Sequence, residues 1–121
     1  MKSVYFMKND KNEIIYIGKT TNLSKRLHEH KLEKKKDDWY SEVKSVEYVS
    51  YNNNYIGDIM EIYYIGKYKP IYNIEYIYEE ELNIDLSEYE KTKLKFNCKK
   101  VDFNLKEINS FDKSFFKKFK I

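Results

Sequence analysis

Three short runs of the chain are rich in β-branched and aromatic residues, the pattern of a strand. They cover residues 3–7 (SVYFM), 14–18 (IIYIG) and 43–51 (VKSVEYVSY), and such residues favour a pleated sheet. The first two runs are separated by the polar residues 8–13, which include Asn and Asp. Both residue types suit tight turns. The pattern therefore predicts a β-hairpin followed by a third strand.

Two other stretches have the spacing of helices. Leucines recur on one face of residues 22–35, where Asn22 or Ser24 can cap the first turn. Residues 57–69 (GDIMEIYYIGKYK) are apolar almost throughout and end just before a proline. They predict a second, largely buried helix with Asp58 as its cap.

The order strand, strand, helix, strand, helix predicts an α/β (α+β) fold, with a small central antiparallel sheet of about three strands flanked by helices. We expect this core to occupy residues 1–74. Residues 75–121 form a C-terminal extension, acidic at first and then basic and aromatic. Within it we expect a strand near 76–78, a short helix, and one or two strands in 91–121. The extension either enlarges a binding surface or only packs on the core and covers a sheet edge.

Composition limits the kind of protein. A single cysteine, Cys98, among 121 residues excludes an intrachain disulfide and the ligand set of an ordinary zinc finger. No apolar run approaches the roughly 20 residues of a membrane span. The start MKSVYFMKNDK is too short and too polar for a signal peptide. We therefore expect a soluble, intracellular (cytoplasmic) protein with no membrane partner.

The net charge of +3 conceals a strong pattern. Residues 1–36 hold ten basic and four acidic residues, and residues 91–121 hold ten and three. Residues 75–90, in contrast, hold seven acidic residues and no basic one. Basic blocks with nearby aromatic residues suit a phosphate backbone. A solvated, lysine-rich surface is the plainer interpretation.

Arg26 is the only arginine in the chain, and all other basic residues apart from histidine are lysines. A planar guanidinium grips phosphate oxygens in two places, which an ammonium group cannot do. His30 lies four residues on and shares the face of the predicted helix, while Tyr5 and Tyr16 lie on the two hairpin strands. These four residues can converge, although packing alone would explain most of the thirteen tyrosines.

Glu61 stands among apolar residues in the second predicted helix. A lone buried carboxylate is costly unless it is paired, hydrogen-bonded or bound to a metal. The alternative is a partly exposed glutamate on a narrow polar stripe with Asp58 and Lys69.

Two other patterns do not indicate a site. The sequence GKT at 18–20 matches part of a phosphate-binding loop, but Glu13 stands where the full motif needs a glycine. His28 and His30 are two residues apart on the predicted helix. Their side chains therefore point to different faces and cannot chelate one metal ion together.

The chain resembles the GIY-YIG nuclease domain in three stretches: SVYFM, YIGKTTNLSKRLHEH and EIYYIGKYKPIYN. In that family a first strand carries G-I-Y, a second carries Y-I-G, and the following helix carries R-x-x-x-H. A glutamate on a later helix and an asparagine beyond it complete the set. The resemblance covers residues 3 to about 74. Ser3 replaces the first glycine of the family pattern, which indicates either that backbone freedom is not needed there or that activity is reduced.

The resemblance implies a catalytic role for five residues. Tyr5 or Tyr16 would be the general base that activates water, and Arg26 would stabilise the charge of the phosphate in flight. His30 would hydrogen-bond a tyrosine or the leaving side. Glu61 would hold a single Mg²⁺ or Mn²⁺ ion, bound weakly in the absence of DNA. A tyrosine with a pKa of about 10 is a poor base at neutral pH, so a nearby cation or proton relay is needed.

The resemblance also implies substrate-binding residues. Lys19 and Lys25 would contact phosphate, Gly18 would allow a strand-to-loop turn, and Asn73 would brace the site. The implied function is a metal-dependent endonuclease acting on DNA, similar to stand-alone members in mobile elements, phages or restriction systems. A homodimer would place two sites across a duplex.

Two other functions stay open at this point. One is a DNA-binding module with a decayed nuclease site, suggested by Ser3. The other is a structural or regulatory protein whose basic blocks contact acidic protein partners, which predicts no salt-dependent affinity for DNA.

Overall fold

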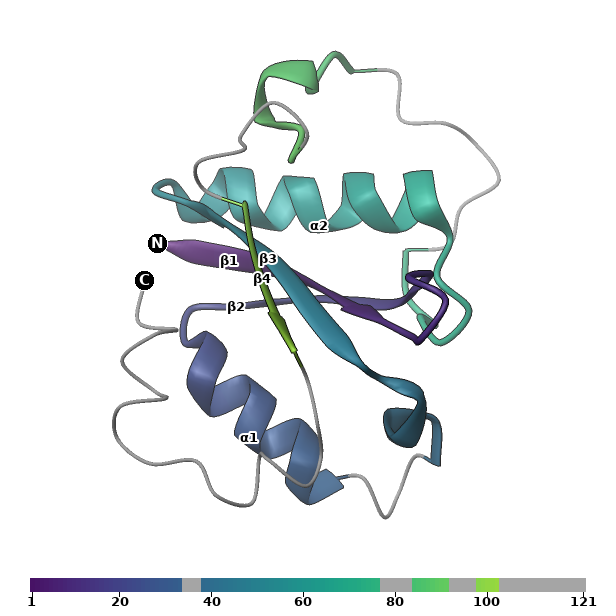
Figure 1. Ribbon diagram of the computed structural model, residues 1–121. Coiled ribbons are helices and arrows are strands. Elements are labelled where there is room, and N and C mark those ends of the chain that lie inside the picture. Colours follow the sequence, from purple (N-terminus) through teal and green to yellow (C-terminus); the bar gives the residue numbers. More distant parts are fainter. Residues whose placement is uncertain (34–37, 77–83, 92–97, 103–121) are drawn as a thin grey trace.

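The computed structural model describes residues 1–33, 38–76, 84–91 and 98–102 (Figure 1). Four antiparallel strands form one sheet in the order β2-β1-β3-β4. In chain order the elements are β1 (Lys2–Lys8), β2 (Ile14–Thr20), α1 (Leu23–Glu33), a 3-10 helix (Asp38–Glu42), β3 (Ser45–Tyr51), α2 (Asn54–Tyr68), a second 3-10 helix (Ser87–Tyr89) and β4 (Cys98–Asp102). The predicted α+β class and the order β-β-α-β-α are confirmed.

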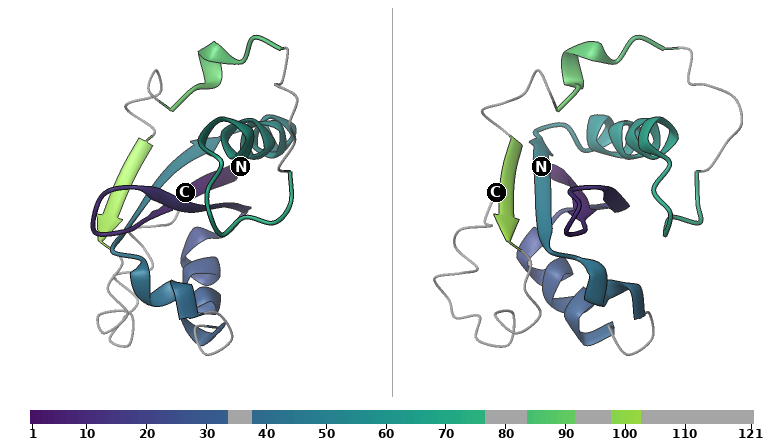
Figure 2. Two further views of the ribbon diagram at one scale, coloured as in Figure 1. Left: turned by 90° about the vertical axis from the view of Figure 1, so that its right-hand side faces the viewer. Right: turned by 45° about the vertical axis from the view of Figure 1, so that its right-hand side comes forward.

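The sheet separates two hydrophobic cores, because alternate residues of a strand point to opposite faces. Helix α1 covers one face and α2 the other (Figures 1 and 2). The core on the α1 side includes Tyr5, Met7, Leu23, Leu27 and Tyr48, and the core on the α2 side includes Val4, Phe6, Met60, Tyr64 and Ile65. Strand β1 thus contributes to both cores, which makes it the centre of the packing.

The local signals for the hairpin and for α1 are confirmed. The turn between β1 and β2 places Asn12 at a φ of 64°, a conformation that asparagine tolerates. Helix α1 begins after Asn22, whose side-chain oxygen accepts a hydrogen bond from the backbone N–H of Lys25 at 3.1 Å. Ser24 is not the cap but donates its hydroxyl to the same oxygen of Asn22.

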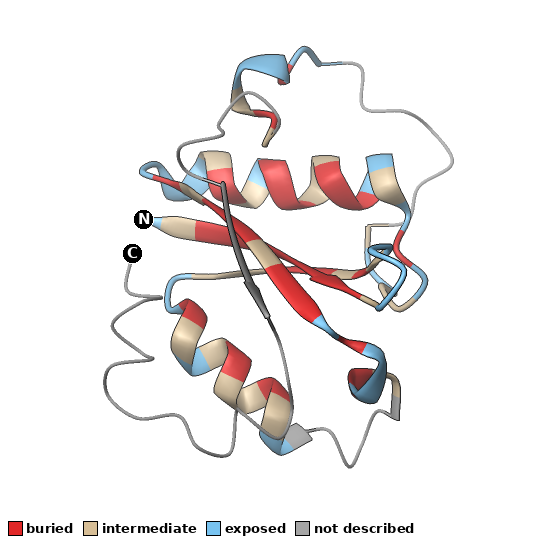
Figure 3. Ribbon diagram, in the orientation of Figure 1, coloured by how far each residue is buried: buried red, intermediate tan, exposed pale blue. Residues whose placement is uncertain are grey.

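Helix α2 begins earlier than predicted. Asn53 is its cap, and its side-chain oxygen accepts hydrogen bonds from the N–H groups of Tyr55 and Ile56. The prediction that Asp58 caps this helix is therefore wrong, and Asp58 lies in its second turn. Only one side of α2 is buried (Figure 3), since Tyr55 and Ile59 are exposed. No helix in the described part of the chain is long and apolar enough to cross a membrane.

The C-terminal extension supplies β4, which pairs with β3 from Ser45 to Val49. It therefore covers the outer edge of β3, which was one of the two roles expected of the extension. The expected short helix is present as the second 3-10 helix. The strand expected at 76–78 lies largely outside the described residues, and Tyr76 itself is in a turn with a φ of 63°.

The segment before β4 is anchored on α2. Leu86 is 8% exposed and belongs to the core on the α2 side. The hydroxyl of Tyr51 donates to the carbonyl oxygen of Tyr89 at 2.6 Å, and the hydroxyl of Tyr64 lies 2.6 Å from that of Tyr51. These contacts therefore join the extension to the hydrophobic core on the α2 side.

Candidate active site

A pocket of about 460 Å³ opens at β2, one of the two edge strands of the sheet that the described residues form. Seven predicted site residues line it: Tyr5, Tyr16, Gly18, Lys19, Arg26, Glu61 and Asn73. His30 lies behind this lining and is buried, while Lys25 is exposed on the first turn of α1 and is not part of the lining. The structure thus brings most of the predicted residues to one place.

The lining comes from both faces of the sheet. Tyr5 belongs to the core on the α1 side, and Arg26 enters the pocket from α1. Ile17 belongs to the core on the α2 side, and Glu61 enters from α2. These groups can meet because, among the described residues, no strand lies beyond β2, so side chains from both faces reach around its edge.

Gly18 is needed to make room for a side chain, not to make a turn. It lies inside β2 and pairs with Tyr5 across the hairpin, and no described glycine has a positive φ. The prediction that Gly18 allows a strand-to-loop turn is therefore wrong. A Cβ atom at this position would lie 2.4 Å from the Tyr5 ring and hydroxyl. Any larger residue would displace the phenol of Tyr5.

Tyr5 and His30 form a buried pair. The Tyr5 hydroxyl lies 2.8 Å from Nε2 of His30, so the hydrogen bond expected between His30 and a tyrosine is made to Tyr5. Burial, helped by the charge of Arg26, lowers the pKa of His30 to about 3. Burial also raises the pKa of Tyr5 well above its usual value. Both side chains are therefore neutral near pH 7.

Of the two motif tyrosines in the lining, Tyr16 is the more accessible. It is partly exposed, whereas Tyr5 is 1% exposed. Burial raises the pKa of Tyr16, and the charge of Arg26 and a hydrogen bond from it act in the opposite direction. Arg26 also pairs with Glu29 at 3.0 Å, and its side chain is 29% exposed. The guanidinium is thus the cation placed to favour a phenolate at Tyr16.

An aromatic wall beside Tyr16 is a feature that sequence reasoning missed. The Trp39 ring stacks on Tyr16 at 5.1 Å and on Tyr72 at 4.9 Å, the second pair being nearly parallel at 9°. The hydroxyl of Tyr72 is hydrogen-bonded to Glu42. All three aromatic residues line the pocket. The available signal was the single tryptophan of the chain standing in a polar segment.

Asn73 closes part of the β2 edge. Its side-chain oxygen accepts from the N–H of Ile17 at 2.8 Å, and its side-chain NH₂ donates to the Ile17 carbonyl at 2.8 Å. The N–H of Tyr72 donates to the carbonyl of Ile15. The carboxamide thus imitates a neighbouring strand, which is the bracing expected of Asn73. Its contact with substrate stays a prediction.

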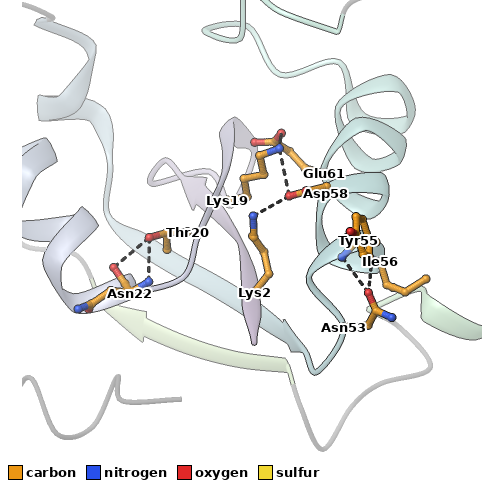
Figure 4. Close-up of polar contacts among 9 residues, drawn as sticks. All are labelled: Lys2, Lys19, Thr20, Asn22, Asn53, Tyr55, Ile56, Asp58 and Glu61. Atoms are coloured by element: carbon orange, nitrogen blue, oxygen red, sulfur yellow. Dashed lines mark hydrogen bonds and ion pairs between the residues drawn. The ribbon is translucent and has the colours of Figure 1, made fainter.

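Glu61 lies in a small network of charges (Figure 4). Its side chain is 10% exposed, and the ammonium nitrogen of Lys19 is 3.6 Å from its Oε1 atom. The same nitrogen is 3.2 Å from Asp58, which also pairs with Lys2 at 2.8 Å. Burial raises the pKa of Glu61 although Lys19 opposes the shift. A hydrogen bond from Lys2 lowers the pKa of Asp58.

Glu61 suits a hard divalent cation. Its Oε1 atom is buried and has no hydrogen-bond partner among the described residues, and the side chain lines the pocket. Oxygen anions are the ligands that Mg²⁺ and Mn²⁺ prefer. No group of three or more His, Cys, Asp or Glu residues able to hold a metal occurs within the described ranges. Glu61 is the buried carboxylate of the lining and the exposed Glu75 is a second one, so the single-ion site stays a prediction.

The sequence pattern of the UvrC-like GIY-YIG domain matches residues 2–74. The chain belongs to this family. It is 40% identical over 73 residues to UvrABC system protein C of Mycoplasmoides gallisepticum, covering 58% of this chain and 12% of that protein. The protein of the same name from Methanococcus maripaludis is 36% identical over 108 residues, 76% of this chain and 20% of that protein.

The protein of that name from Borrelia garinii is 36% identical over 74 residues, covering 59% of this chain and 12% of the relative. The chain therefore spans only a small part of the length of these relatives. No solved structure matches the chain.

Proposed function

We propose that this chain is a metal-dependent endonuclease that hydrolyses phosphodiester bonds of DNA. The observation that carries the proposal is the meeting of Arg26, Tyr16 and Glu61 in one pocket at the β2 edge. Membership of the GIY-YIG family supports the same reaction class. The reaction needs an activated water, a cation at the crowded phosphate and help for the leaving oxygen, and the pocket offers a group for each.

Arg26 is the phosphate-binding group in this proposal. Its guanidinium lines the pocket from α1, and a bidentate grip on two phosphoryl oxygens stabilises the charge that develops on them. Lys19 adds a second positive charge on the same side as Glu61. Lys25, exposed one residue before Arg26, contributes only to the longer-range attraction of the phosphate backbone.

Tyr16 is the general base, because it is partly exposed in the pocket whereas Tyr5, which also lines it, is buried against His30. Its phenolate form, which the charge of Arg26 favours, takes a proton from the attacking water and becomes the neutral phenol. Tyr5 and His30 are a neutral pair that positions Tyr16. Their ring centroids lie 6.2 Å and 5.6 Å from the centroid of the Tyr16 ring. The Trp39 ring holds the other side of Tyr16.

Glu61 would hold Mg²⁺ or Mn²⁺, which would act as a Lewis acid toward the phosphate and the leaving oxygen. The buried carboxylate contributes one ligand, and water and DNA oxygens provide the others.

The environment of Ser3 supports an intact site over the alternative of a decayed one. Ser3 lies in β1, pairs with Thr20 and Ser50, and is not among the described residues with positive φ. Its hydroxyl is 3.0 Å from that of Ser50. A glycine is thus not required there, and Ser3 is away from the pocket lining.

Replacing Glu61 with glutamine tests the proposal directly. We expect the wild type to nick supercoiled plasmid in the presence of Mg²⁺ or Mn²⁺, and Glu61→Gln to lose at least about 100-fold in rate, since an amide is a much weaker ligand for a hard cation. Glu88→Gln makes the same chemical change at an exposed position and should keep wild-type activity. Nicked and linear products distinguish independent cuts from the paired cuts expected of a homodimer.

Salt-sensitive binding of DNA without cleavage would replace the nuclease proposal with the DNA-binding module. Absence of both binding and cleavage would favour the structural or regulatory protein.

The cleavage rate should rise with pH. Burial raises the pKa of Tyr16 above 10, so the phenolate is the minor form at neutral pH and its fraction grows as pH rises. We expect the single-turnover rate to increase about tenfold per pH unit between about pH 6 and pH 9. His30, with a pKa of about 3, contributes no titration in this range. A Tyr16→Phe variant that retains the same rate and slope would contradict this role.

A further inference from the structure

Lys19 stands between two carboxylates of α2 that are one helical turn apart. Its ammonium nitrogen is 3.2 Å from Asp58 and 3.6 Å from Glu61 (Figure 4). The side chain of Glu61 is nine-tenths buried, and its Oε1 atom lacks a hydrogen-bond partner among the described residues. The protein thus already places a cation of its own beside the carboxylate that suits a divalent ion.

A divalent ion bound at Glu61 would be repelled by the ammonium group of Lys19. Two like charges a few ångströms apart repel strongly where water is partly excluded. The long, flexible stem of Lys19 lets its charge move, but the charge then needs another acceptor. Asp58 is that acceptor, since it already lies closer to the ammonium nitrogen than Glu61 does.

Asp58 is poorly placed to be a ligand itself. Two ammonium groups already pair with it, at 2.8 Å from Lys2 and 3.2 Å from Lys19. Its side chain is 40% exposed, in contrast to the buried side chain of Glu61. The two carboxylates therefore differ in role. Glu61 is buried and its Oε1 atom has the ion pair with Lys19 but no hydrogen bond among the described residues, whereas Asp58 is at the surface beside two ammonium groups.

We propose that Asp58 is a positioning residue of this site, which holds Lys19 away from Glu61 when a divalent cation binds there. Binding is then an exchange, in which the ion pairs with Glu61 and the ammonium group of Lys19 pairs with Asp58 alone. The inference rests on the proposed function for the assignment of Glu61 as the cation ligand. It adds a residue outside the motifs by which the sequence resembles its family.

The test is a titration with Mn²⁺ alone, in the absence of DNA, with free Mn²⁺ measured by electron paramagnetic resonance at physiological salt. We expect Asp58→Asn to weaken binding about fivefold or more, because Lys19 is then left with Glu61 as its acceptor. Lys19→Gln should tighten binding by removing the competing cation. In the Lys19→Gln background, Asp58→Asn should change the affinity by less than about twofold.

Lys2→Gln is the matched control. It removes one positive charge and the other partner of Asp58 but leaves both contacts of Lys19 in place. We expect its Mn²⁺ affinity to stay within about twofold of wild type, since Lys19 keeps its ion pair with Asp58. Circular dichroism spectra should be unchanged in all variants.

Three results would overturn the inference. Equal weakening by Asp58→Asn with and without Lys19 would make Asp58 a direct ligand. No effect of Asp58→Asn in either background would leave it without a role at the site. An unchanged Mn²⁺ affinity in Glu61→Gln would show that the ion does not bind at Glu61. Plasmid nicking by the wild type would still measure the nuclease activity independently of this result.

Discussion

Replacing Arg26 with alanine should abolish cleavage of DNA and leave the fold intact. We expect a loss of at least about 100-fold in nicking rate, the scale seen when a preorganised group that stabilises transition-state charge is removed. The side chain is 29% exposed and also hydrogen-bonds Tyr16, so the cost in stability should be about 1–2 kcal/mol, too little to unfold the domain. Initial nicking rates and thermal unfolding measure the two effects separately.

Two further variants sharpen this expectation. Arg26→Lys keeps the charge but loses the planar fork, so it should recover only part of the activity. Lys25→Ala removes the exposed charge one residue earlier in α1 and should lower the rate by no more than about threefold. Near-wild-type cleavage by Arg26→Ala would remove the phosphate-binding role and with it the main argument for why the chain keeps a single arginine.

Ending the chain after residue 74 should unfold it, although the family match stops there. The shortened chain would lose β4 from the edge of β3, the buried side chain of Leu86 and the carbonyl of Tyr89 that accepts from Tyr51. Burial of one leucine contributes about 2 kcal/mol, and each hydrogen bond lost with β4 and Tyr89 contributes about 1 kcal/mol. These losses are comparable with the whole stability of a small domain. Chemical denaturation followed by circular dichroism checks this expectation.

A matched pair of point variants tests the same contact in the full chain. Leu86→Ala should lower the free energy of unfolding by about 2–3 kcal/mol, because Leu86 is 8% exposed in the core. Ile84→Ala removes a similar volume two residues earlier, where the side chain is 60% exposed, and should change it by less than about 0.5 kcal/mol. Equal effects, or a stable chain of 74 residues, would show that the extension is not part of the folding unit.

Local signals in the sequence were sufficient for most of the fold. The β-branched and aromatic residues of β1 and β2, the polar turn between them and the Asn22 cap are signals from neighbouring residues, and the structure confirms all three. The start of α2 was predicted too late. Both Asn53 and Asp58 have side chains that suit a cap, and only the first accepts hydrogen bonds from free N–H groups of the helix.

The site residues that belong to a sequence motif were predictable. Those that reach the site through contacts between distant parts of the chain were not. The motif led to Tyr16, Arg26 and Glu61, which the structure places in one pocket. It gave no sign that Asp58 would share Lys19 with Glu61, because that contact depends on how α2 lies against β2. Trp39 was missed for the same reason, since its stacking partners come from distant parts of the chain.

The aromatic wall has a practical consequence. Trp39 is the only tryptophan of the chain, and it lies in the pocket lining in contact with Tyr16. The intrinsic fluorescence of the protein, excited selectively at the indole, therefore comes from the candidate active site alone. Entry of a metal ion or a nucleotide into the pocket should change this emission, so occupancy can be followed without a label, even in variants that no longer cut DNA.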